Sequence, residues 1–122
     1  MTDVIRHQNA DEWNDLVRRS GGHPLQLWGW GDVKAAHGWS VDRVQIGESG
    51  AQLLIRRLPG PLGPLVYVPR GPFGSLLTEA ADREALVADV KRRYKPTLLS
   101  VEPDTVGVLD WSGWRRSSNR IL

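Results

Sequence analysis

The apolar positions of this chain fall into segments with two different spacings, one typical of helices and one typical of strands. The clearest helical segment begins after Asn9 or Asp11, either of which can cap a helix, and ends at residues 20–22, which read Ser-Gly-Gly. Within it three apolar residues follow the i, i+3, i+4 spacing that buries one face of a helix: Trp13, Leu16 and Val17. We therefore predict an amphipathic helix here.

Two further helices follow from less regular patterns. Residues 27–36 predict a short helix in spite of two glycines, and Gly38 is placed to end it in the left-handed conformation. Residues 78–94 predict a longer helix that is capped by its first residue, a threonine, and that turns Leu86 and Val90 to the core. Three basic residues close to its end suit the negative pole of the helix dipole.

Strands are predicted where apolar and β-branched residues alternate or form short buried runs. The candidates are residues 4–7, 39–46, 51–58, 65–68 and 97–101, and residues 114–121 can add another. Residues 47–50 read Gly-Glu-Ser-Gly and predict a turn, so the second and third strands should form a hairpin. Residues 59–64 read Pro-Gly-Pro-Leu-Gly-Pro and predict a loop, because they cannot pair regularly in a sheet.

The predicted order β-α-α-β-β-β-α-β gives an α/β (α+β) fold with a mixed sheet flanked by helices. It is also the order of elements in the GNAT acyltransferase fold, truncated here at its C-terminal strands. A length of 122 residues suits one domain and not two. We therefore expect a single partial GNAT-like domain over residues 1–122, although topology alone indicates no activity.

Composition limits the chemistry and the partners. The 16 basic and 14 acidic residues are too evenly balanced for a general nucleic-acid binder, although a pI of about 9.4 leaves anionic ligands open. The chain has no cysteine, which excludes disulfides, thiolate catalysis and cysteine-zinc sites. The three histidines lack metal-site spacing and no nucleotide-binding glycine motif occurs, so we expect neither a metal nor a cofactor. The chain also lacks a signal peptide and a run of about 20 apolar residues, which predicts a cytoplasmic protein without a membrane span.

Two short segments carry the candidate chemistry. Residues 24–39, PLQLWGWGDVKAAHGW, place three of the six tryptophans around Lys34: Trp28, Trp30 and Trp39. Their rings either stack on a base or sugar or fill the core, with Trp30 the strongest candidate for binding. Lys34 is either a phosphate ligand or a solvated helix lysine. Residues 67–72, YVPRGP, set Arg70 and a glycine between two prolines, where Arg70 can face an anion, cap the strand end or pair with Glu79.

These two segments, with Leu99 to Pro103 and Gly113 to Arg115 after them, resemble in order the motifs of the first domain of the Fem peptidyltransferases. Trp30 to Lys34 is similar to that family's aromatic-x-x-x-Lys pattern, and the resemblance implies that Lys34 contacts the diphosphate of a nucleotide-linked muropeptide. In some members a polar residue two or three places further on helps to hold the nucleotide, and His37 is the polar residue there. The implied substrate-binding residues are therefore Lys34, Trp30, Arg70 and His37.

The family transfers amino acids from aminoacyl-tRNA to peptidoglycan precursors. The resemblance implies an acceptor-binding domain for a nucleotide- or lipid-linked muropeptide, inactive alone, with aminoacyl-tRNA held by a second domain. It assigns no catalytic residue, because the substrate amine attacks the aminoacyl ester and the enzyme mainly positions the reactants. We also expect an uncovered C-terminal sheet edge that favours a homo-oligomer. The alternatives are a non-catalytic ligand-binding or interaction module on a half GNAT fold, and an acetyltransferase that uses coenzyme A.

Overall fold

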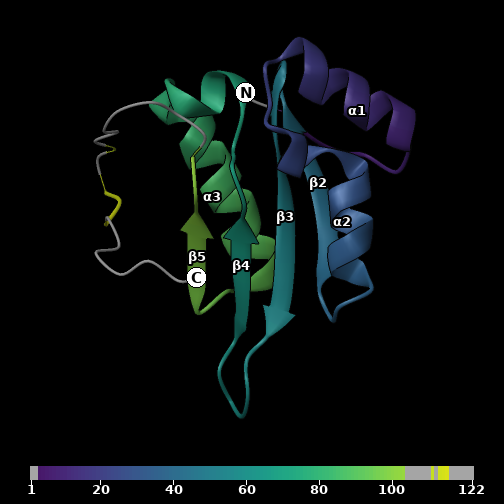
Figure 1. Cartoon of the computed structure of the whole chain (residues 1–122). Helices are drawn as coiled ribbons and strands as arrows, with labels where there is room; N and C mark the ends of the chain where they lie inside the picture. Colours follow the sequence, from purple (N-terminus) through teal and green to yellow (C-terminus); the bar gives the residue numbers. More distant parts are fainter. Residues whose placement is uncertain (1–2, 104–110, 112, 116–122) are drawn as a thin grey trace.

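The computed structural model describes residues 3–103, 111 and 113–115 (Figure 1), and within them the chain forms one five-stranded mixed sheet. The strands follow the chain order across the sheet: β1 (Val4–Arg6), β2 (Ser40–Ile46), β3 (Ser49–Arg57), β4 (Pro64–Val68) and β5 (Leu98–Val101). Neighbouring strands are antiparallel from β1 to β4, whereas β4 and β5 are parallel. The expected α/β (α+β) class with a mixed sheet is confirmed.

Three helices cover the two faces of this sheet unequally. α1 (Ala10–Arg19) and α2 (Trp28–Ala35) lie on one face beside β2 and β3, and α3 (Ala80–Tyr94) lies on the other (Figure 1). Short 3-10 turns at Pro24–Gln26 and Gly74–Leu77 precede α2 and α3. On the face that carries α1 and α2, none of the described helices lies over β4 and β5.

Buried apolar residues form two clusters. Ala51 and Leu53 face α3 and join the larger cluster, which contains Leu86 and Val90 as predicted. A smaller cluster lies under α1 and is formed by Trp13, Leu16, Val17 and Phe73. The three apolar residues of the predicted α1 stripe are all fully buried, so the helical spacing identified the correct face.

Two sequence predictions need correction at element ends. β2 and β3 pair as far as Ile46 with Ser49, so their turn contains only residues 47 and 48, and Gly47 takes the positive φ that such tight turns require. Thr78 does not cap α3. Its backbone N–H donates to the carbonyl oxygen of Ser75 and closes the preceding 3-10 turn, so Glu79 becomes the N-cap residue.

An ionic cluster fastens the edge strand β1 to α3. The Arg6 guanidinium donates to both Asp42 on β2 and Asp89 on α3, and Tyr94 donates its hydroxyl proton to Asp42. Burial, followed by the hydrogen bond to Asp42, raises the pKa of Tyr94 to about 12. The cluster therefore holds three elements together through charges that are largely removed from water.

The predicted strand over residues 114–121 falls mostly outside the described residues, within which β5 is the last strand of the sheet and pairs with β4. The expected homo-oligomer through the C-terminal sheet edge therefore stays a prediction.

Candidate functional site

The tryptophans around α2 each lie against a cation of their own. The distance from ring centroid to cation is 3.5 Å for Trp28 and Arg43, 5.0 Å for Trp30 and Lys34, and 4.2 Å for Trp39 and Arg56. All three indoles are half-buried. Cation–π contacts at such distances are attractive because the ring face is electron-rich. The cluster predicted around one lysine is thus a row of three separate pairs.

Trp30 and Lys34 lie one helical turn apart, so their side chains share one face of α2. The Trp30 indole Nε1 is buried and has no hydrogen-bond partner among the described residues. A buried N–H without an acceptor is rare in folded proteins and calls for an explanation. Trp30 is therefore the predicted site residue with an unmet hydrogen bond next to a cation.

The close approach of α2 to the sheet depends on Gly31. A Cβ atom there would collide with the Arg43 guanidinium and would lie 2.6 Å from Gln52 Oε1. Arg43 instead donates from Nε to Gln52 Oε1 at 2.8 Å, and burial lowers the pKa of Arg43. The glycine that weakens the helical pattern is therefore the residue that lets this helix pack on β2 and β3.

Gln26 joins the segment before α2 to the loop after β4. Its side chain is fully buried and donates from Nε2 to the carbonyl oxygen of Pro69 at 2.6 Å, while its Oε1 accepts from the backbone N–H of Gln52 at 2.7 Å. A Cβ on Gly71 would lie 2.7 Å from Gln26 Cδ. Gln26 therefore holds the loop that carries Arg70 against the framework of α2. Gln26 received no role in the sequence analysis. A single glutamine between Leu25 and Leu27 was nevertheless a signal of a buried polar group.

Arg70 follows β4 with a φ of 50°, and its Nε lies 3.6 Å from Glu102 Oε1. Glu102 also faces the phenol of Tyr67, and burial together with this carboxylate raises the pKa of Tyr67. The Tyr67 ring in turn lies 6.4 Å from the ring of Trp39. We call Arg70, Glu102, Tyr67 and Trp39 the β4–β5 strip, and it follows the sheet face that no described helix covers.

The four predicted substrate-binding residues are only partly brought together. Trp30 and Lys34 form a pair. His37 is exposed in the turn after α2, and its ring Nδ1 lies 2.7 Å from the carbonyl oxygen of Val33 in that helix. Arg70 lies in the loop after β4, beside Glu102. Tyr67 and Glu102 stand inside the quoted motifs but received no role from the sequence.

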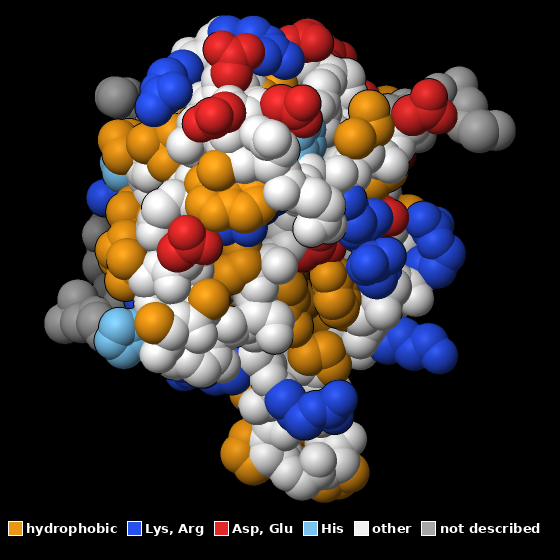
Figure 2. Space-filling model, turned by 90° about the vertical axis from the view of Figure 1, so that its right-hand side faces the viewer, with side chains coloured by type: hydrophobic (Ala, Val, Ile, Leu, Met, Phe, Trp, Pro, Cys, Tyr) orange, Lys and Arg blue, Asp and Glu red, His pale blue; other side chains and the backbone are white. Residues whose placement is uncertain are grey.

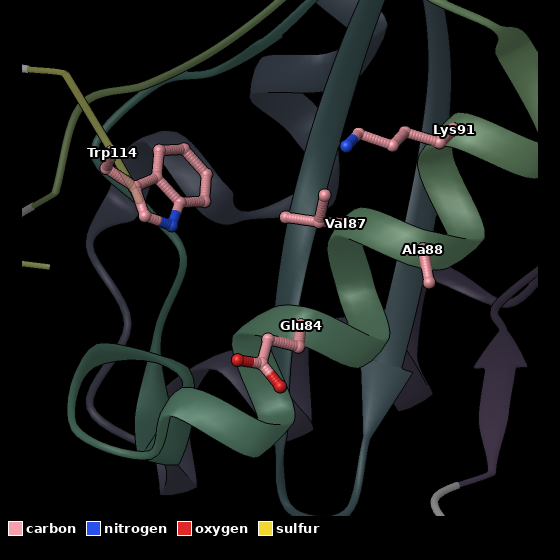
Figure 3. A pocket seen from close by; sticks show the side chains of 5 residues that line it. All are labelled: Glu84, Val87, Ala88, Lys91 and Trp114. Carbon is pink, nitrogen blue, oxygen red and sulfur yellow. The ribbon is translucent and has the colours of Figure 1, made fainter. Parts of the chain in front are cut away.

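A pocket of about 290 Å³ lies elsewhere, on α3 (Figure 3). It is lined by Glu84, Val87, Ala88 and Lys91 of the helix and by Trp114. None of the predicted site residues lines it, so the candidate site is the exposed surface around α2 and the β4–β5 strip. Within the described part of the chain, no three His, Asp or Glu residues gather closely enough to hold a metal ion.

Comparison with known proteins gives this surface a context. No protein-family model matches the chain. The lipid II:glycine glycyltransferase of Staphylococcus haemolyticus is 32% identical over 108 residues, which cover 82% of this chain and 25% of that protein. The enzyme of the same name from Staphylococcus aureus is 29% identical over 110 residues, covering 80% and 25%. The chain is a partial homologue of the Fem transferases.

The crystal structure of FemX has the same fold over the matched part. Its TM-score is 0.62 at 24% identity, and the match covers 76% of this chain and 24% of FemX. The Fem-like chain thus spans about a quarter of the length of these relatives. Among its described helices, none is both long and apolar enough to cross a membrane.

Proposed function

We propose that this Fem-like chain binds the muropeptide acceptor of a transferase that lengthens peptidoglycan precursors. The observation that carries the proposal is the Lys34–Trp30 pair on α2, in a chain homologous to lipid II:glycine glycyltransferases. Lipid-linked and nucleotide-linked muropeptides share a diphosphate joined to a sugar. A cation beside an aromatic face suits that combination, because the cation binds the phosphate and the ring packs on the sugar or base.

The β4–β5 strip extends this surface. Arg70 supplies a second cation, Glu102 supplies an acceptor for sugar hydroxyls, and the rings of Tyr67 and Trp39 supply apolar faces. The buried Gln26 side chain ties the loop of Arg70 to the segment before α2, and we infer from this link that the two cations serve one ligand. We assign His37 a peripheral role at the end of α2.

We further propose that the acceptor amine attacks the ester of an aminoacyl-tRNA that is bound outside this surface. The surface would then contribute by holding one reactant, and the chain alone would not turn over. An assay with charged tRNA and a muropeptide tests this point. Measurable turnover by the isolated chain would refute the division of labour, whereas the absence of turnover together with acceptor binding would support it.

Titration of a uridine diphosphate-sugar against labelled protein tests the binding site itself. Half a site should give about millimolar affinity, or about −4 kcal/mol. We expect the amide shifts to cluster on α2 and the β4–β5 strip, and Lys34→Ala to reduce them. Lys91→Ala, on the exposed side of α3, is the matched control. Shifts that cluster on α3, or that survive Lys34→Ala, would refute the assignment.

A further inference from the structure

A second surface of the molecule combines exposed apolar residues with a collar of positive charge. Residues 58–63 connect β3 and β4, and in Figures 1 and 2 this connection projects below the rest of the molecule. We call residues 58–63 the β3–β4 tip. Its sequence is Leu-Pro-Gly-Pro-Leu-Gly, and the side chain of Leu62 is 50% exposed. Half of this apolar side chain therefore faces water.

The basic collar consists of Arg56, Arg57 and Lys95, all exposed. Arg57 pairs in register with Pro64 at the base of the tip, and Lys95 follows α3 against Gly63, where a Cβ would lie 2.8 Å from the Lys95 carbonyl oxygen. Figure 2 shows Lys and Arg side chains directly above the projection and hydrophobic side chains on it. The collar therefore surrounds the apolar tip on two sides.

No acidic residue offsets this charge within the segments that build this end of the molecule. Residues 49–78 and 90–101 contain neither Asp nor Glu. Two carboxylates on the neighbouring elements β2 and α3 are engaged elsewhere, since Asp42 accepts from Arg6 and Tyr94, and Asp89 accepts from Arg6 and Arg92. The collar therefore carries a net positive charge at this end of the molecule.

We propose that the β3–β4 tip docks on the surface of an anionic bilayer, with Leu62 in the boundary between headgroups and acyl chains and the basic collar on the lipid phosphates. A narrow projection of this kind is poorly shaped for a protein interface, which normally buries about 800 Å² on each side. A bilayer accepts a single apolar tip, and its anionic headgroups attract basic residues nearby. This inference does not depend on the proposed acceptor site, because Leu62, Arg57 and Lys95 have no part in that site. Arg56 alone touches both surfaces, through its contact with the Trp39 ring.

Cosedimentation with vesicles tests the docking. The probes are vesicles of phosphatidylcholine alone and vesicles in which roughly one third of the lipid is phosphatidylglycerol. We expect binding only to the anionic vesicles, weakened by added salt. Leu62→Ser should weaken it roughly tenfold, and Arg57→Gln roughly fivefold. The matched controls are Ile5→Ser, which changes a side chain that is also 50% exposed but lies on β1, and Arg18→Gln on α1.

The absence of cysteine allows a direct reading of insertion. Leu62→Cys and Ile5→Cys can each carry one environment-sensitive dye. We expect the emission of the dye at position 62 to shift to the blue with anionic vesicles and that of the dye at position 5 to stay unchanged.

Equal binding to neutral vesicles, equal loss in the Ile5→Ser control, or an unshifted dye at position 62 would each overturn the proposal. So would a tip that proves to join two copies of the chain, seen as a concentration-dependent mass in light scattering that Leu62→Ser abolishes while vesicle binding is absent.

Discussion

The side-chain amide of Gln26 donates to the carbonyl oxygen of Pro69 across 43 positions of sequence, at 2.6 Å. Through its other polar atom the same side chain accepts from the backbone of Gln52 on β3. One buried residue thus ties the start of α2, a central strand and the loop of Arg70 together. Because every polar atom of this side chain is removed from water, the partners have no substitute if it is lost.

Gln26→Met should therefore destabilise the fold by about 1–3 kcal/mol, since it keeps the volume but leaves the Pro69 carbonyl and the Gln52 N–H without a partner. Urea unfolding at equilibrium measures the loss. The control is Gln8→Met, because Gln8 is exposed and its replacement should leave the free energy of unfolding nearly unchanged. Equal effects of the two substitutions would show that the Gln26 contacts are not formed in solution.

Two glycines of α2 should respond in opposite directions to the same substitution. Gly29→Ala meets no atom within 4 Å and should stabilise the protein by up to about 1 kcal/mol, because alanine is the better helix former. Gly31→Ala gains the same propensity but drives a Cβ into Arg43 and Gln52, so it should destabilise. Thermal unfolding of both variants decides. A stabilising Gly31→Ala would mean that α2 does not pack against β2 and β3 as described.

Most of the order of helices and strands could be predicted from the sequence, because the apolar spacing in α1 and the alternation in the strands are local signals. A mixed sheet was expected, but the pairing of Leu65 with Leu98 in the parallel β4–β5 pair could not be predicted, because it is set only when α3, which lies between them in sequence, packs on the sheet. The error at Thr78 has a local cause. The N–H and the hydroxyl of Thr78 both donate to the carbonyl oxygen of Ser75 in a 3-10 turn, and the helix begins one residue later.

The candidate site was harder to predict than the fold. Tryptophans and a lysine on one short segment were visible in the sequence, and Lys34 does lie on Trp30. The cations that cover Trp28 and Trp39 come from β2 and β3, and no spacing along the chain could assign them. Their positions follow from the strand register, in which Arg43 stands opposite Gln52. Long-range pairing, rather than local propensity, therefore decides which cation faces which ring.

Tyr94 should make stability depend on pH in the alkaline range. The ordinary pKa of tyrosine is about 10, and in the folded protein that of Tyr94 is raised to about 12. A raised pKa means that the contribution of this phenol is complete below pH about 10 and is lost as the pH rises towards about 12. Tyr94→Phe should lower stability below that window and flatten the pH dependence within it. Urea unfolding across the window measures both, and an unchanged slope would contradict the contact with Asp42.

Removal of each of the two charges beside Tyr67 in the β4–β5 strip should move the pKa of this phenol in opposite directions. The chain has only two tyrosines, so in a Tyr94→Phe background ultraviolet titration reports Tyr67 alone. Burial raises the pKa of Tyr67, the carboxylate of Glu102 raises it further, and the guanidinium of Arg70 lowers it. Glu102→Gln should therefore lower this pKa, although burial keeps it above the ordinary value of about 10, and Arg70→Gln should raise it.

Glu12→Gln, which removes an exposed carboxylate on α1, is the control and should leave the titration of Tyr67 unchanged. The signs matter more than the sizes, because exposed charges are screened by water and salt. If Glu102→Gln and Arg70→Gln move the pKa of Tyr67 in the same direction, the two charges do not flank the phenol. The uncovered face of β4 and β5 would then lack the arrangement on which the second cation of the proposed acceptor site depends.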